Sequence, residues 1–213
     1  MKINNLIDYI HSEKSIPDMY PRYMAEDFII HVTNKIDFLY KNPLCIGYLS
    51  PKDFKCESKN EKCDEYFLKK LALLSTINIS TSNLTQCCNL CIEHFPRLNF
   101  KRESLFFSIN GIKFEVEHGE FIVAFKDYEF ISPQTILHYV AHHNYNPPDQ
   151  YVESVNNVDV MSFFYKYVDS MVKQGIDEYI LYEIINFSKV KDFIIDVDDY
   201  MNTLKFDFSG LFF

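Results

Sequence analysis

The chain contains no tryptophan, only five glycines and no long apolar run. Five glycines leave little material for a glycine-rich phosphate-binding loop, and no such pattern occurs in the sequence. No segment reaches the run of about 18 apolar residues that a membrane span requires. The first residues, Met1–Leu6, also lack the apolar stretch of a signal peptide. We therefore expect a soluble, intracellular protein without a membrane anchor.

Basic residues are few relative to acidic ones. The 213 residues include 21 Lys and Arg against 30 Asp and Glu, which gives a formal net charge of -9. Proteins that wrap nucleic-acid phosphates use clustered Lys and Arg, so nucleic acid is not expected as the main partner. Hydrophobic residues make up 47% of the chain, which is enough to bury a core without disulfide bonds.

The hydrophobic period predicts an α+β fold, mostly helical with a central antiparallel β-meander of three or four strands. Apolar and polar residues alternate over 105–109 and again over 112–116, on either side of Asn110-Gly111. An Asn-Gly pair between two such runs is typical of a hairpin with a type I′ turn. Two further turns, His118-Gly119 and Lys126-Asp127, are expected to lead into the remaining strands.

Helical spacing of apolar residues flanks this meander on both sides. The sequence therefore predicts three regions, which can pack as one domain. They are a helical region over residues 1–96 that a zinc ion could pin, the meander with a helix-Pro-Pro-helix module over 97–155, and a C-terminal helical bundle over 156–213.

Some helix boundaries can also be predicted. Ser132-Pro133 is expected to begin a helix, with Ser as N-cap and Pro in the first turn. The last of three C-terminal helices is expected over 190–204. An acidic stripe on it (Asp192, Asp196 and Asp199) is expected to be its solvated face, and a Mg²⁺ site is the alternative.

Six cysteines without an export signal are expected as reduced thiols. Cys88 and Cys91 form a C-x2-C pair, and zinc is bound by four nitrogen or sulfur ligands in a tetrahedron. The expected zinc ligands are Cys56, Cys63, Cys88 and Cys91, with Cys87 or His94 as substitutes.

Two other interpretations of the C-x2-C pair remain open. Cys88 and Cys91 share a helical stripe with Leu84 and Phe95, which is typical of buried core thiols. A redox role is the third interpretation, because a C-x-x-C pair at a helix start can have a lowered thiol pKa.

A second candidate metal site is His138-x-x-x-His142, which His143 follows directly. Two histidines at i and i+4 share one helix face, but Tyr139 stands where zinc proteases carry their glutamate base. A third ligand would come from the neighbouring turns, with Glu117, His118 and Glu120 as candidates. The alternative is that these histidines pack or form hydrogen bonds at the corner that follows the helix.

One segment resembles a known family. Residues 128–155 contain Pro133, His138-Tyr139, His143, Tyr145 and Pro147-Pro148 at the spacing of a "P.LI.HY...H.Y.PP..F" pattern. This pattern is found in short uncharacterised proteins of bacteria and large DNA viruses. The resemblance implies a strand that leads into a helix and a Pro-Pro corner, but it carries over no catalytic residue. Ser132 and Ser154 depart from the family's pattern, and the residue bias resembles that of a mimivirus-like giant DNA virus.

Together these features favour a non-catalytic accessory or protein-interaction protein of a giant DNA virus, located in the host-cell cytoplasm or the virion. Its expected partner is an unidentified protein, and its expected cofactor is structural zinc. The enzyme alternative is a metal-dependent hydrolase that uses His138, His142 and a carboxylate. No nucleophile, base and oxyanion arrangement can be assembled from the sequence for another reaction.

Overall fold

The computed structural model describes residues 44–47, 63–77, 88, 91, 105–116, 119–125, 128–173, 175–194 and 199–212. The strands are β1 (Leu44–Cys45), β2 (Phe106–Ile109), β3 (Ile112–Glu115), β4 (Glu120–Phe125), β5 (Tyr128–Pro133) and β6 (Phe206–Asp207). The α-helices are α2 (Glu65–Thr76), α4 (Ile136–His143), α5 (Asp149–Asn157), α6 (Val160–Lys173), α7 (Glu178–Ile184) and α8 (Tyr200–Thr203). Three 3₁₀ helices complete the set: η3 (Asn186–Lys189), η4 (Lys191–Phe193) and η5 (Ser209–Leu211). Within these ranges, no helix has the length and apolar character needed to cross a bilayer.

The predicted α+β class is confirmed, but the strands divide differently from the expected meander. They form two three-stranded sheets, with the orders β1-β5-β4 and β3-β2-β6. β3 therefore does not pair with β4, and each hairpin recruits a short strand from elsewhere in the chain. β1 joins β5 in parallel, and β6 joins β2 in antiparallel orientation.

The β2–β3 hairpin forms as predicted. Ile109 pairs with Ile112 across a two-residue turn. Asn110 and Gly111 have φ angles of 50° and 81°, and a type I′ turn needs positive φ at both central positions. Asn tolerates this left-handed region and Gly enters it without a steric cost, so the turn residues set the register of the hairpin.

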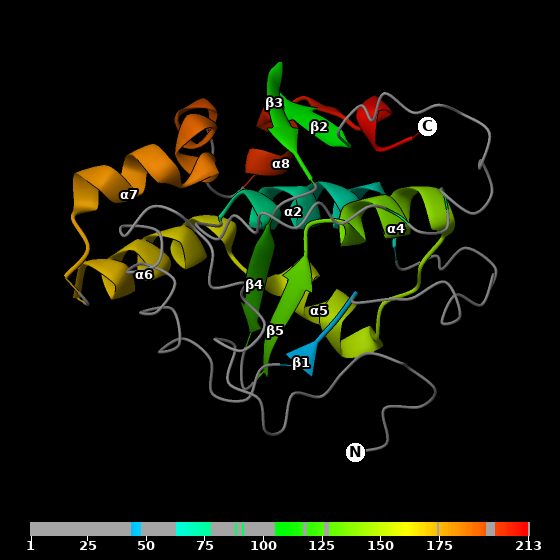
Figure 1. Cartoon of the computed structure of the whole chain (residues 1–213), viewed down its shortest axis with the longest axis horizontal. Helices are drawn as coiled ribbons and strands as arrows, with labels where there is room; N and C mark the ends of the chain where they lie inside the picture. The colour runs from blue at the N-terminus through cyan, green and yellow to red at the C-terminus, as the bar shows by residue number, and fades with distance from the viewer. Residues whose placement is uncertain are drawn as a thin grey trace.

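Helix α2 is the centre of the core. It begins after Asp64, whose Oδ1 accepts a hydrogen bond of 2.8 Å from the amide of Phe67 and so caps the helix. Most of its residues from Phe67 onward are buried. In Figure 1 the helix crosses the middle of the molecule, with β4 and β5 below it and the β2–β3 hairpin above.

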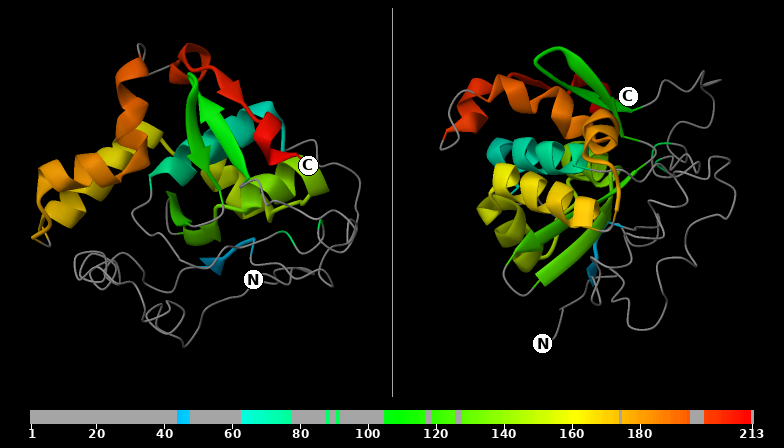
Figure 2. Two further views of the ribbon diagram at one scale, coloured as in Figure 1. Left: turned by 45° about the horizontal axis from the view of Figure 1, so that its top comes forward. Right: turned by 90° about the vertical axis from the view of Figure 1, so that its left-hand side faces the viewer.

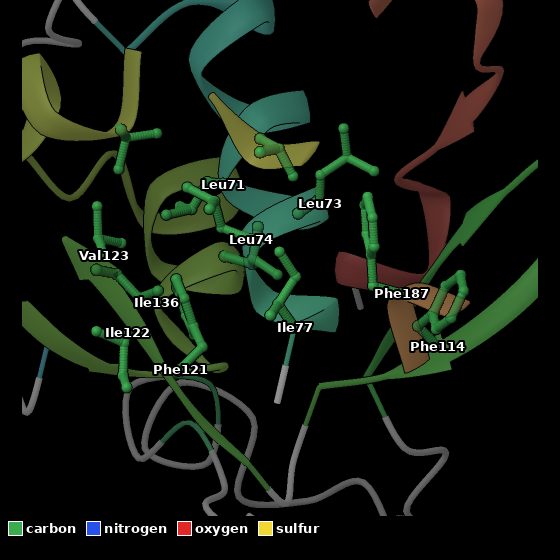
Figure 3. Packing of buried hydrophobic residues seen from close by; sticks show 14 of the residues in the cluster. Leu71, Leu73, Leu74, Ile77, Phe114, Phe121, Ile122, Val123, Ile136 and Phe187 are labelled. Carbon is green, nitrogen blue, oxygen red and sulfur yellow. The ribbon is translucent and has the colours of Figure 1, made fainter. Parts of the chain in front are cut away.

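Both sides of α2 are packed with apolar side chains. Figure 3 shows Leu71 and Leu74 on the side of β4 and α4, and Leu73 and Ile77 nearer to the hairpin and η3. The neighbours labelled there are Phe121, Ile122, Val123, Ile136, Phe114 and Phe187. α2 contacts β4 of one sheet, and its Lys69 ammonium lies 5.9 Å from the Phe206 ring of the other. A single hydrophobic core therefore extends through the described parts of the chain.

The predicted start of the helix at Ser132-Pro133 is wrong. Both residues belong to β5, where Pro133 pairs with Glu120, and α4 begins at Ile136. The Ser132 hydroxyl does not cap a helix because it donates a buried hydrogen bond of 2.9 Å to the Tyr151 hydroxyl. This contact ties β5 to α5 directly after the Pro147-Pro148 corner.

The predicted helix over 190–204 is also wrong in the residues that the structure describes. Residues 186–193 form successive 3₁₀ turns, with i→i+3 bonds such as Val190 N–H to Phe187 O at 3.0 Å. From there to residue 204, the described part of the chain has one α-helix, α8, which is four residues long. β-branched residues such as Val190 and Ile194 have low helix propensity, so tertiary packing decides the backbone here.

The C-terminal segment continues from α8 along the first hairpin. β6 extends the β2–β3 sheet, and η5 then contacts both β2 and α4. The second view of Figure 2 shows this hairpin at one end of the molecule and β4 and β5 at the other, with α2 and α6 between them. The end of the chain thus lies next to the helix that carries the histidine cluster.

Candidate metal centre

Four metal-ligating side chains meet in one buried cluster. One ligand atom from each of Cys88, Cys91, His138 and His143 lies within 4.8 Å of every other. His138 is 0% exposed, Cys88 2% and Cys91 4%, and His143 is half-buried. The two candidate sites seen in the sequence, the C-x2-C pair and the histidine helix, therefore contribute two residues each to one place. We call these four residues the Cys₂His₂ cluster.

The end of α4 positions the two histidines. Asn144 caps the helix with φ 53°, and the amide of Tyr145 donates a bond of 2.9 Å to Tyr139 O. This left-handed cap ends the helix directly after His143, as is common where Asn replaces Gly at this position. The Nε2 atoms of His138 and His143 lie 3.1 Å apart, although the two residues are five positions apart rather than four.

The other predicted ligands fall outside the cluster or outside the described residues. Cys63 is buried in the hydrophobic core just before α2 and is not one of the four. Cys56, Cys87 and His94 lie outside the residues that the structure describes. Of the carboxylates and histidine expected beside the His138 helix, Glu117 and His118 are not described either, and Glu120 at the start of β4 is not in the cluster.

His142 lies beside the cluster and packs against it. Its ring stacks on His138 with centroids 5.1 Å apart, and its neighbour on another side is the Phe212 ring at 5.6 Å. His142 is thus part of the wall around the cluster, and His143 supplies the second nitrogen. The i, i+4 spacing predicted His142 as the second ligand. That rule assumes a regular helix and does not consider the side-chain direction of the last helical residue, His143.

The spacing of the four atoms fits a tetrahedral metal. The Cys88 sulfur lies 3.1 Å from His143 Nε2, and the Cys91 sulfur lies 3.4 Å and 3.2 Å from the Nε2 atoms of His138 and His143. Around zinc, with about 2.3 Å to sulfur and about 2.0 Å to nitrogen, tetrahedral neighbours are about 3.3–3.8 Å apart. The observed distances are close to the lower end of this range, and the remaining pairs lie within 4.8 Å. An ion therefore fits after small side-chain movements.

A backbone contact selects the tautomer of His138 that a metal needs. His138 Nδ1 lies 2.7 Å from the carbonyl oxygen of Leu211. A carbonyl can only accept, so Nδ1 carries the hydrogen and donates it. In the neutral ring this leaves the lone pair on Nε2, which faces the cluster. Metal-ligating histidines are typically oriented by such a bond from the other ring nitrogen.

Burial shifts the pKa values of Cys91 and His138 toward their neutral forms. It raises the pKa of the Cys91 thiol to about 12, and the adjacent Cys88 thiol acts in the same direction. Burial also lowers the pKa of His138 to about 4; the Leu211 carbonyl opposes this change, and His143 and His142 add to it. The neutral imidazole is the form that binds a metal, and thiols lose their protons when a metal binds. A bound cation would therefore release thiol protons.

The acidic stripe shows no such convergence in its described members. Asp192 and Asp199 are exposed, and the Asp199 carboxylate accepts two hydrogen bonds of 2.7 Å from the Asn202 amide. Asp196 lies outside the described residues. Neither Asp192 nor Asp199 belongs to the metal-ligating group found among the described residues.

These observations define an α+β protein with a buried Cys₂His₂ cluster that can hold a metal ion. The chain belongs to the family described as domain of unknown function DUF7919, whose model matches residues 15–156, about two thirds of the sequence. All four residues of the cluster lie within the matched region, as do residues 128–155. No curated protein and no solved structure matches the chain.

Proposed function

We propose that this protein binds one zinc ion through Cys88, Cys91, His138 and His143, and that the ion has a structural role. The observation that carries the proposal is the convergence of two thiols and two imidazoles, at tetrahedral spacing, from segments about 50 residues apart in the sequence. Two thiolates with two imidazoles are typical of zinc, whereas Mg²⁺ and Ca²⁺ take oxygen ligands.

The structural role is favoured over hydrolysis by the number of ligands. A catalytic zinc ion keeps one position open for water or substrate, whereas a structural zinc ion is held by four protein side chains. The cluster supplies four, three of them almost completely buried. The hydrolase interpretation would also require His142 as a ligand, yet its ring stacks on His138 beside the cluster.

Zinc in this cluster would connect two parts of the chain that are far apart in the sequence. Cys88 and Cys91 come from one part of the chain, and His138 and His143 come from α4. The ion supplies a strong link with fixed geometry between these two parts. Because metal binding and folding are coupled in such sites, zinc would stabilise the native state.

Elemental analysis with matched variants tests the proposal. We expect one zinc per chain in the purified protein, and loss of that zinc in Cys88→Ser and His143→Ala. His142→Ala is the control: it removes the neighbouring imidazole and is expected to keep the zinc. The hydrolase interpretation predicts the reverse for the two histidine variants. Absence of zinc from the unaltered chain after purification and refolding with zinc would contradict the proposal.

The wider function belongs to the same proposal. We also propose a non-catalytic accessory role for the chain, through contacts with another protein. Exposed aromatic side chains on α6 and α7, Tyr165 and Tyr179, and a net charge of -9 are compatible with a protein partner. The residue bias supports a giant-virus origin, with the host-cell cytoplasm or the virion as the location.

A further inference from the structure

The cluster has a fifth contributor that is not a ligand. The carbonyl of Leu211 accepts the hydrogen of His138 Nδ1 at 2.7 Å, from a residue 73 positions further along the chain. Leu211 lies outside residues 15–156 that match the family, whereas all four ligands lie within them. We infer that the C-terminal segment, residues 205–212, is the positioning element of the zinc site, and that its docking is coupled to zinc binding. This inference rests on the zinc proposal above.

The segment is docked on the first hairpin by contacts that fix its path. The amide of Asn110 donates to the Lys205 carbonyl, and the amide of Lys205 donates to Asn110 Oδ1, both at 2.8 Å. β6 then pairs with β2, with Phe206 opposite Ile109. The type I′ turn that closes the hairpin therefore also binds the start of the C-terminal segment through two hydrogen bonds.

Gly210 brings η5 close to the hairpin. A Cβ atom at this position would lie 2.6 Å from ring carbons of Phe106, which is closer than real Cβ contacts allow. The missing side chain allows the backbone to approach β2, and the next residue, Leu211, is fully buried. The position of the Leu211 carbonyl thus depends on the seating of η5 between β2 and α4.

The last described residue adds a second contact with the histidines. The ring of Phe212 meets His142 edge-on at 5.6 Å, and His142 stacks on His138. The segment therefore holds the His138 ring through a hydrogen bond at Nδ1 and supports the neighbouring ring that covers it. Without the segment, neither the tautomer nor the ring orientation of His138 would be fixed.

Coupling between docking of the C-terminal segment and zinc binding must be reciprocal. If the docked segment favours the zinc-binding form of His138, zinc must favour the docked segment by the same factor. Loss of the partner of a metal-bound histidine typically lowers metal affinity by about 10–100-fold. Zinc is accordingly expected to lower the equilibrium constant for opening of the segment by about 10–100-fold.

Zinc affinity, measured by competition with a chromophoric chelator, tests the first half of this coupling. A chain ending at Phe208 and a Gly210→Val variant are both expected to bind zinc about 10–100-fold more weakly. Valine is chosen because Phe106 is only half-buried and could yield to a single methyl group. The control, deletion of Phe213 alone, keeps residues 205–212 and is expected to change affinity less than about threefold.

Hydrogen exchange in the unaltered chain tests the second half. The amide of Leu211, bonded to Phe208 O at 2.9 Å, is expected to exchange about 10–100-fold more slowly when zinc is present. This measurement tests the coupling between zinc binding and docking of the segment even if neither altered chain folds. Equal zinc affinity in all folded variants, or equal Leu211 exchange with and without zinc, would overturn the coupling while zinc binding stands. Absence of zinc binding in the unaltered chain would instead refute the proposed function.

Discussion

Changing Cys91 to alanine is expected to remove zinc from the protein and to lower its Tm by about 10 °C. Its sulfur lies 3.4 Å and 3.2 Å from the two histidine nitrogens of the cluster. A ligand present at 1,000 times its Kd stabilises the native state by about 4 kcal/mol. For a chain of this size, each kcal/mol corresponds to about 2–4 °C in Tm. Thermal unfolding followed by circular dichroism, with and without a chelator, measures the effect.

The chain offers a matched control for this experiment in Cys63. Like Cys91 it is a buried cysteine in the hydrophobic core, but it lies outside the Cys₂His₂ cluster. Cys63→Ala removes the same sulfur atom, so it is expected to cost about 1 kcal/mol of packing and to retain full zinc content. A chelator should lower the Tm of Cys63→Ala but not that of Cys91→Ala. Equal Tm values for the two variants, together with no response to chelator, would contradict a structural zinc.

Changing Leu74 to alanine is expected to reduce the free energy of unfolding by about 2–5 kcal/mol. Leu74 is fully buried on the central helix, on the side that faces β4 and α4. Truncation there removes apolar contacts and leaves a cavity that the two sheets cannot close without moving α2. Chemical denaturation in the presence of zinc measures the loss.

An aliphatic truncation on the surface provides the comparison. Val172 on α6 is exposed, so Val172→Ala is expected to change the free energy of unfolding by less than about 0.5 kcal/mol. A loss below about 1 kcal/mol for Leu74→Ala would show that α2 does not hold the core together.

The local features of the fold could be predicted from the sequence, and the pairing of its parts could not. Asn110-Gly111 determines its turn through the φ angles of two residues, and the structure has both positive. Which sheet each hairpin joins depends on β1 and β6, two-residue strands too short to have a pattern of their own. The split of the expected meander into two sheets therefore has no local signal.

The predicted helix boundaries failed where tertiary contacts outweighed local preferences. Ser132-Pro133 has the composition of a helix start, yet the bond from Ser132 to Tyr151 holds it in β5. Residues 190–204 have apolar spacing close to helical, but the described part forms 3₁₀ turns and a single helical turn at α8. Among the apolar positions of the second segment, Val190 is buried as expected, but Phe193 is 45% exposed.

The candidate metal centre was visible in the sequence as two incomplete halves. The C-x2-C pair lacked two ligands of suitable spacing, and the histidine helix lacked the ligands to complete its own site. Each half supplies the two ligands that the other lacks. This match between the two incomplete ligand sets is the signal that could have predicted one shared site. The contact between Cys91 and His138 spans 47 residues, and no spacing rule covers such a distance. The Leu211 carbonyl has no side-chain signal at all.

X-ray absorption at the zinc edge is the sharpest test of the proposed Cys₂His₂ zinc site, because it counts the atoms bound to the metal. We expect two sulfur neighbours at about 2.3 Å and two nitrogen neighbours at about 2.0–2.1 Å in the zinc-loaded protein. We also expect His142→Ala to leave the spectrum unchanged and Cys88→Ser to hold no zinc to measure. Four sulfur neighbours, or a shell of oxygen and nitrogen alone, would contradict a zinc site built from Cys88, Cys91, His138 and His143.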